Sequence, residues 1–140
     1  LQVIRGAVFD VAVDIRRGSP LFGNWVGYEL SEENRRQMYV SEGFAHGFCV
    51  LSDVADVVYK CSAFYAPEDE RSVLWSDRDL DIQWPVHDPV LSLKDSRSPR
   101  LTDIALDHLP EYEGSDTTSN LERIPLFSSL GQMGENQRII

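Results

Sequence analysis

The feature that most constrains the fold of this chain is a run of alternating side chains in residues 3–15. Apolar residues occupy every second position, and acidic or small residues lie between them: Phe9, Val11, Val13 and Ile15 against Asp10, Ala12 and Asp14. Successive side chains of a β-strand point to opposite faces of a sheet, so the run predicts a strand with one apolar face. No helical period, with apolar residues three or four positions apart, persists in the sequence.

Further short apolar runs follow along the chain. We expect extended segments at residues 25–30, 36–40, 44–51 and 55–62. Stretches rich in Gly, Pro, Ser, Asn and Asp separate these runs and break regular structure. Short strands at this spacing are typical of a sandwich or barrel rather than of alternating strands and helices. The sequence therefore predicts an all-β fold.

The composition changes near Asp103. Between residues 103 and 122 there are six acidic residues and neither Lys nor Arg. We therefore divide the chain into a core at residues 1–103 and a C-terminal extension at 104–140. A short helix capped by Thr102 or Asp103 is expected at 104–109. Small polar residues from Gly114 onward predict a flexible, partly disordered tail.

The charge balance argues against two classes of partner. The chain has 13 basic and 23 acidic residues, for a net charge of −10. Nucleic-acid backbones and anionic membranes attract positive surfaces, and no apolar run reaches membrane-spanning length. Cys49 and Cys61 both lie in apolar runs, where cysteines are usually buried and reduced. These features favour a cytoplasmic protein that binds neither nucleic acid nor membrane.

His46 is the first candidate site residue. It shares a strand face with Phe44 and Phe48, and Gly47 leaves room for a bulky group to approach the backbone. If this face lines a barrel interior, His46 projects into a cavity between two aromatic rings. On spacing alone, a core histidine held by one hydrogen bond is the favoured interpretation, and the functional one stays open.

Two other residues have suitable chemistry. Tyr59 can donate a proton if its hydroxyl faces a polar pocket, although a strand tyrosine more often fills a core. Asp95 is typical of a cap or turn, and is functional only beside a histidine that it orients. A metal site is not expected, because His46 stands alone and His87 and His108 lie in loop or tail sequence.

A series of short motifs occurs in order between Leu1 and about Asp103. They comprise residues 5–16, Gly18-Ser19-Pro20, Phe22-Gly23, Trp25-Val26-Gly27, residues 33–37 and 42–48, Val58-Tyr59-Lys60, Tyr65-Ala66-Pro67, Leu74-Trp75, Trp84-Pro85 and Leu91-Ser92-Leu93-Lys94-Asp95. As an ordered set they resemble the dTDP-4-dehydrorhamnose 3,5-epimerase family. The resemblance implies a cupin-like jelly-roll barrel, that is, a double-stranded β-helix.

The resemblance also implies an activity. Enzymes of this family epimerise C3 and C5 of dTDP-4-dehydro-6-deoxy-D-glucose, giving dTDP-4-dehydro-L-rhamnose for dTDP-L-rhamnose and hence lipopolysaccharide or cell-wall polysaccharide biosynthesis. The C4 ketone acidifies both neighbouring C–H bonds, so a base removes each proton and an acid returns one on the opposite face. The implied enzyme is a homodimer that binds a dTDP-sugar and needs no cofactor.

Carried over residue by residue, the resemblance assigns Tyr59 as the proton donor and Asp95 as the residue that orients the base. The substrate-binding residues that it implies are His46, near the enolate or phosphate, Tyr65, stacked on the thymine, and Glu70 and Lys94, at the nucleotide.

The family's base histidine lies in an Arg-Gly-Leu-His stretch upstream of the position matched by Leu1. A lysine for the oxyanion is upstream as well. We therefore expect an N-terminally truncated member that is inactive by itself. Two alternatives stay open: a related sugar-nucleotide 3-epimerase or ketoisomerase, and a non-catalytic sugar-nucleotide-binding cupin. The presence of both Tyr59 and Asp95 favours an enzyme.

Overall fold

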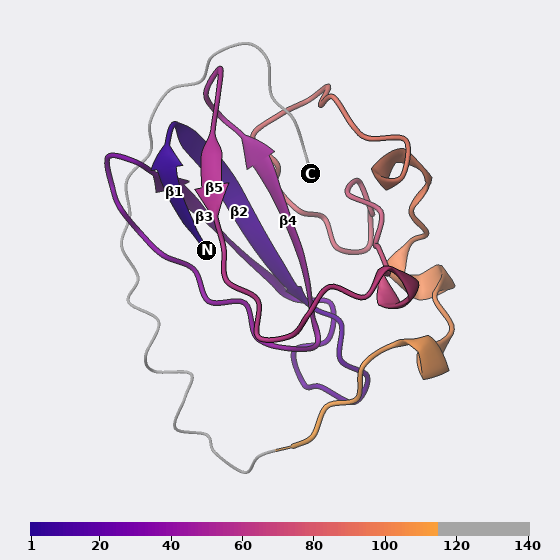
Figure 1. Cartoon of the computed structure of the whole chain (residues 1–140). Coiled ribbons are helices and arrows are strands. Elements are labelled where there is room, and N and C mark those ends of the chain that lie inside the picture. Colours follow the sequence, from indigo (N-terminus) through magenta and orange to yellow (C-terminus); the bar gives the residue numbers. More distant parts are fainter. Residues whose placement is uncertain (115–140) are drawn as a thin grey trace.

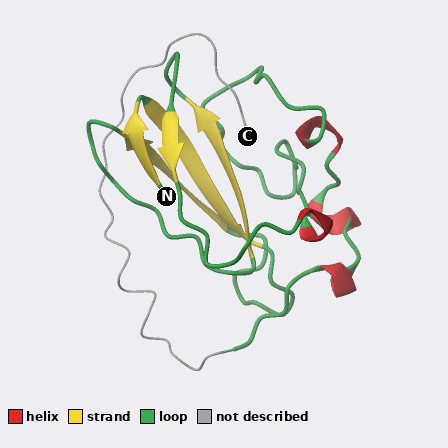
Figure 2. Ribbon diagram, viewed as in Figure 1, coloured by secondary structure: helices red, strands yellow, loops and turns green. Residues whose placement is uncertain are grey.

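The structure, a computed structural model, describes residues 1–114 as two antiparallel β-sheets followed by loops and single 3-10 turns (Figures 1 and 2). The strands are β1 (Gln2–Arg5), β2 (Ala7–Asp14), β3 (Trp25–Ser31), β4 (Phe44–Val50) and β5 (Asp56–Val58). The 3-10 turns are η1 (Pro67–Asp69), η2 (Asp95–Arg97), η3 (Leu101–Asp103) and η4 (Leu106–His108). The all-β prediction is confirmed, and no helix in the described residues is long and apolar enough to cross a membrane.

The larger sheet has three strands in the order β3-β2-β4. Asp10 lies opposite Tyr28 on β3 and Phe48 on β4, and Ala12 lies opposite His46. Directly paired residues point to the same face. The register therefore confirms the predicted alternation along β2, and it places the acidic face of β2 on the same side as His46.

Both faces of this sheet are covered. Residues 59–114, here called the loop region, follow β5 and lie beside β4 in Figure 1. On the apolar face of the sheet, Val11 and Val13 pack against Leu80, Leu101 and Leu109 of this loop region. Fully burying side chains of this size contributes about 1.5–3 kcal/mol each. The loop region is therefore held to the sheet although it contains little regular secondary structure.

The opposite face is covered by the small sheet, in which β1 pairs with β5. Val3 of β1 packs there against Val8 and Leu30. The first expected strand, at residues 3–15, is thus divided between two sheets. The division falls at Gly6, which has φ +75°, and a Cβ there would lie 2.0 Å from the backbone oxygen of Val54. Only glycine fits this corner.

Other boundaries differ from the expectations. Residues 36–40 form no strand beyond a bridge between Gln2 and Gln37. Strand β5 is only Asp56–Val58: the Gly6 corner ends β1 at Arg5, opposite Asp56, and the pairing stops at the other end where Gln2 lies opposite Val58. The helix expected at 104–109 is the single turn η4, with Ala105 as N-cap and no side-chain cap. The predicted caps Thr102 and Asp103 are wrong, because both residues belong to the preceding turn η3.

The C-terminal extension begins in contact with the core. Leu109 is buried there, and Arg17 forms a parallel bridge with Glu111. The division of the chain at residue 103 stays a prediction. The expected flexible tail lies almost wholly outside the described residues.

Candidate functional site

A cavity of about 1130 Å³ lies between the sheet and the loop region. Val11 and Val13 of β2 and Ala45 of β4 supply part of an apolar wall. Four of the residues predicted for the site line the same cavity: His46, Glu70, Lys94 and Asp95. Mostly apolar walls with a few convergent polar groups are typical of small-molecule sites.

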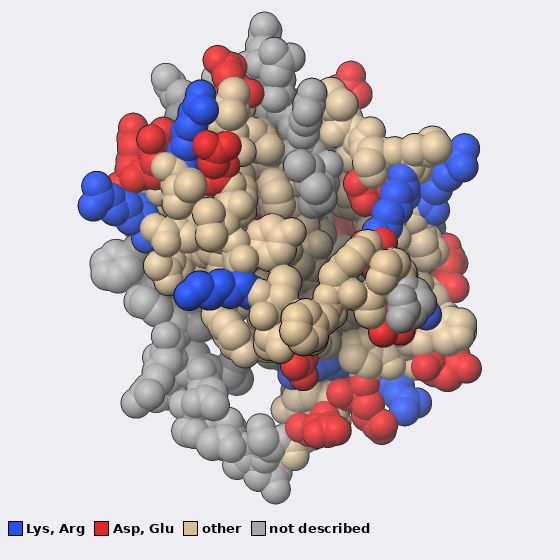
Figure 3. Space-filling view, in the orientation of Figure 1, with Lys and Arg blue, Asp and Glu red and all other residues tan. Residues whose placement is uncertain are grey.

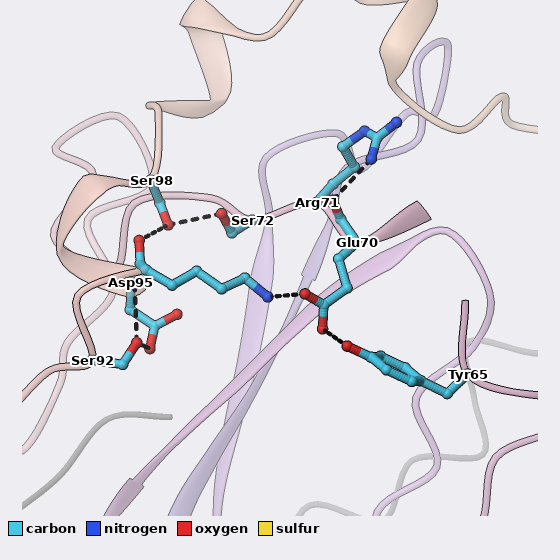
Figure 4. A network of polar contacts seen from close by, with 8 residues as sticks. Tyr65, Glu70, Arg71, Ser72, Ser92, Asp95 and Ser98 are labelled. Carbon is cyan, nitrogen blue, oxygen red and sulfur yellow. Dashed lines mark hydrogen bonds and ion pairs between the residues drawn. The ribbon is translucent and has the colours of Figure 1, made fainter. Parts of the chain in front are cut away.

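Glu70 joins two other predicted residues into one network (Figure 4). Its Oε1 accepts a hydrogen bond from the Tyr65 hydroxyl at 3.0 Å, and its Oε2 accepts one from Lys94 Nζ at 2.5 Å. The turn η1 lies between Tyr65 and Glu70, so that the two side chains meet on one side of the loop. The structure therefore brings together the three residues that the resemblance assigns to the nucleotide.

The network fixes the charge states of its members. The hydrogen bond from Lys94, followed by that from Tyr65, lowers the pKa of Glu70. The hydrogen bond to Glu70 in turn raises the pKa of Lys94 and the pKa of Tyr65. At neutral pH the network thus consists of a carboxylate, an ammonium group and an un-ionised phenol.

The loop that carries Lys94 is hydrogen-bonded to the segment that follows Glu70. Ser98 Oγ donates a hydrogen bond to Ser72 Oγ at 2.8 Å and lies 3.4 Å from the backbone oxygen of Lys94 (Figure 4). This hydrogen bond joins two segments more than twenty residues apart in the sequence, and it therefore helps to keep Lys94 close to Glu70.

Asp95 closes a turn. Its Oδ2 accepts a hydrogen bond from Ser92 Oγ, and its backbone N–H donates to the same hydroxyl oxygen at 3.1 Å. Asp95 Oδ1 has no hydrogen-bond partner in residues 1–114, and no histidine of that part of the chain is bonded to Asp95. Its role as partner of a base stays a prediction.

His46 is paired with a different carboxylate. Its Nε2 lies 3.0 Å from both Oδ1 and Oδ2 of Asp10, and its ring is tilted by 43° against Phe48 at a centroid distance of 6.2 Å. Asp10 was not among the predicted site residues. The signal for it in the sequence is a carboxylate in the middle of the most apolar strand, where burial requires a partner.

Tyr59 is not assembled with the other candidates. It follows the end of β5 at Val58, is 67% exposed and does not line the cavity. The extended segment expected at residues 55–62 is shorter than predicted, because pairing with β1 ends at Val58, directly before Tyr59. Cys61 is exposed rather than buried, whereas Cys49 is buried as expected.

The described residues form no broad cationic patch on the face shown in Figure 3. In Figure 3, acidic and basic side chains are interspersed around an uncharged central area of the face shown. Among residues 1–114, no group of three or more His, Cys, Asp and Glu side chains is placed to hold a metal ion.

Comparison with solved structures places the fold in the class of cupin-like jelly-roll proteins. A Legionella pneumophila dTDP-6-deoxy-D-glucose-3,5-epimerase in complex with dTDP-4-keto-L-rhamnose aligns with a TM-score of 0.78 and 52% identity, over 81% of this chain and 61% of that one. A 3'-monoepimerase from Streptomyces bikiniensis in complex with dTDP-quinovose aligns with a TM-score of 0.75 and 42% identity, over 79% and 57%.

The particular family follows from the sequence comparison. The model of the dTDP-4-dehydrorhamnose 3,5-epimerase family matches residues 1–103, and the chain belongs to this family. A Shigella flexneri dTDP-4-dehydrorhamnose 3,5-epimerase is 55% identical over 103 residues, which are 74% of this chain and 57% of the relative. The chain spans about half the length of the curated relatives it matches.

Proposed function

We propose that this chain is part of an enzyme that epimerises C3 and C5 of dTDP-4-dehydro-6-deoxy-D-glucose, giving dTDP-4-dehydro-L-rhamnose for dTDP-L-rhamnose biosynthesis. The observation that carries the proposal is the convergence of His46, Glu70, Lys94 and Asp95 on one cavity in a member of this family. The Legionella relative, whose described ligand is dTDP-4-keto-L-rhamnose, supports the substrate class.

The Tyr65–Glu70–Lys94 network is suited to the nucleotide half of the substrate. Lys94 supplies a cation for the diphosphate, and Glu70 holds both Lys94 and the Tyr65 hydroxyl in place. The exposed ring of Tyr65 offers a face on which thymine can stack, because aromatic rings bind bases through their π-faces. Glu70 is thus the organising residue of this half of the site.

The sugar half of the site needs donors for the negative charge that develops on O4 when a proton leaves C3 or C5. His46 lines the cavity and supplies such a donor when its ring is protonated. Proton transfer beside a ketone involves no net oxidation, so the reaction requires no redox cofactor. Asp95 Oδ1, which has no partner in the described residues, is available to orient a base histidine.

Tyr59 has to approach the cavity to deliver a proton. It belongs to an exposed loop, residues 59–66, that also contains Tyr65. A substrate whose thymine stacks on Tyr65 would engage this loop and bring the Tyr59 hydroxyl closer to the sugar. Assembly as a homodimer in the cytoplasm is part of the proposal, and light scattering of the purified protein measures the oligomeric state.

Binding is the first test. Isothermal titration of the chain with dTDP should give saturable binding, and Lys94→Ala should weaken it by about ten- to a hundredfold, the effect of one hydrogen bond to a charged group. Lys60→Ala is the matched control, because Lys60 is an exposed lysine outside the cavity. Absence of dTDP binding by the wild-type chain, or equal losses in the two variants, would contradict the proposal.

Activity is the second test. A chimera that joins the preceding segment of the Shigella flexneri relative to Leu1 should incorporate deuterium at C3 and C5 of the ketosugar in deuterated water. Proton NMR of the product then distinguishes inversion at both carbons from inversion at C3 alone, the alternative raised by the structural likeness to a 3'-monoepimerase. A chimera that is folded but catalyses no exchange would refute the epimerase assignment.

A further inference from the structure

Asp10 is a completely buried carboxylate with a single side-chain partner. Its exposed fraction is 0%, and both of its oxygens lie 3.0 Å from the same atom, Nε2 of His46. Among the described residues, no other side chain forms a hydrogen bond with Asp10, and no buried side-chain oxygen is left unpaired. The pairing of Asp10 therefore depends wholly on one imidazole nitrogen.

The neighbouring acidic residue does not share this role. Asp14 lies on the same face of β2, but its carboxylate accepts hydrogen bonds from Arg16 and Ser19. The Arg16 guanidinium therefore pairs with Asp14 and not with Asp10. Within residues 1–114, His46 is the one side chain positioned to donate a hydrogen bond to Asp10.

An ionised carboxylate can only accept hydrogen bonds, so the nitrogen that faces it must carry a hydrogen. We infer that Asp10 is a positioning residue that keeps the hydrogen of His46 on Nε2 and leaves Nδ1 as the nitrogen that meets a ligand. The strand register supports a fixed geometry, because Asp10 and His46 occupy diagonal positions on the paired strands β2 and β4.

His46 is the exposed member of the pair. A third of its side chain, 33%, is accessible, and it lines the cavity, whereas Asp10 does not. Its Nδ1 has no hydrogen-bond partner in the described part of the chain. The consequence for a sugar nucleotide, which rests on the proposed function, is that the substrate oxygen meets Nδ1 and not Nε2.

Nitrogen NMR of the uniformly ¹⁵N-labelled chain tests the assignment at neutral pH. The chain has only three histidines, so His46→Gln identifies the His46 signals by their loss. We expect hydrogen on Nε2 in the wild type, with or without a second hydrogen on Nδ1. Asp10→Asn keeps the size of the side chain but offers an amide that can also donate to Nε2. A hydrogen bond to a charged group biases an equilibrium by about tenfold or more, so this bias should be lost.

Asp53→Asn, a change at an exposed acidic residue, is the matched control and should leave the His46 signals unchanged. Hydrogen on Nδ1 alone in the wild type would overturn the inference, as would an unchanged His46 spectrum in a folded Asp10→Asn chain. If Asp10→Asn does not fold, the wild-type tautomer still decides the question.

Titration with dTDP-4-dehydro-6-deoxy-D-glucose separates this inference from the proposed function. We expect the Nδ1 resonance to move more than that of Nε2, and the opposite order would overturn the role of Nδ1. If the nucleotide sugar does not bind, the proposed function fails, while the tautomer measurement still decides the role of Asp10.

Discussion

Replacing Asp14 with alanine should lower the free energy of unfolding by about 3 kcal/mol. Asp14 is 1% exposed, and its carboxylate accepts four hydrogen bonds. Three come from Arg16, from the backbone N–H at 3.0 Å, Nε at 2.9 Å and Nη2 at 2.6 Å. The fourth comes from Ser19 Oγ at 2.7 Å.

The magnitude follows from what the mutation leaves behind. Removing one partner of a buried ion pair costs about 3–5 kcal/mol, because the other charge stays in a poorly solvated place. The lower end applies to Arg16, because 22% of its side chain reaches water and its guanidinium lies 4.5 Å from the ring centroid of Phe44 and 4.9 Å from that of Tyr112. These rings continue to stabilise the cation after the carboxylate is gone.

Urea unfolding followed by tryptophan fluorescence measures the loss. Glu111→Gln is the control, because it removes the exposed ion pair with Arg17 and should cost less than about 1 kcal/mol. If Asp14→Ala stays within about 1 kcal/mol of the wild type at unchanged urea dependence, the argument from a buried, multiply bonded carboxylate is refuted.

The loss of stability in Asp14→Ala should also depend on pH. Burial opposes ionisation of Asp14, but hydrogen bonds from Arg16 and Ser19 outweigh burial and lower its pKa. A carboxyl group with a lowered folded-state pKa contributes its full stability above its unfolded pKa, about 3.9, and loses it as the pH falls through the folded value. The stability difference between wild type and Asp14→Ala should therefore be constant near neutral pH and shrink below about pH 4.

Three further outcomes are expected. In the chimera, Tyr59→Phe should keep deuterium exchange with retained configuration but lose inverted product in the proton NMR spectrum; near-normal inversion would exclude Tyr59 as the acid. Gly27→Ala would place a Cβ 2.4 Å from the Phe9 ring and should cost about 1–3 kcal/mol in a thermal melt, whereas an unchanged melting temperature would show that the ring moves freely. A thiol reagent at pH 8 should label exposed Cys61 but spare Cys49, whose burial raises its pKa to about 11; equal labelling of the folded chain would contradict this.

The strand pattern was predictable where each strand has one apolar face. The alternation along β2 and the shared face of His46 and Phe48 follow directly from a period of two. The Gly6 corner was not predictable in this way, because residues on both sides of it continue the apolar run while its cause is contact with Val54, far along the chain. The exposed position of Tyr59 was not predictable from the local pattern either, because the length of β5 depends on its pairing with β1, which stops where Val58 lies opposite Gln2.

For the site, residue types and the family resemblance identified Glu70, Lys94 and Tyr65, and the structure brings these together. The Asp10–His46 pair escaped prediction. A carboxylate that alternates with valines looks like the solvent side of a strand, until a second sheet is known to cover that face. Predicting the pair would have required knowing that the β1–β5 sheet covers this face of β2.

The Gly6 corner also has a consequence for the order in which the chain assembles. Within the three-stranded sheet, Val13 pairs with Trp25, which is close to it in the sequence. On the other side of the Gly6 corner, Gln2 pairs with Val58, which is much farther along the chain. Closing the longer loop between β1 and β5 costs more conformational entropy. The pairing of β1 with β5 that this closure allows is only a few residues long. We therefore expect β2, β3 and β4 to form early and the β1–β5 ribbon to close last and open first. In native-state hydrogen exchange, its amides should exchange through local openings, well before those of the central strand.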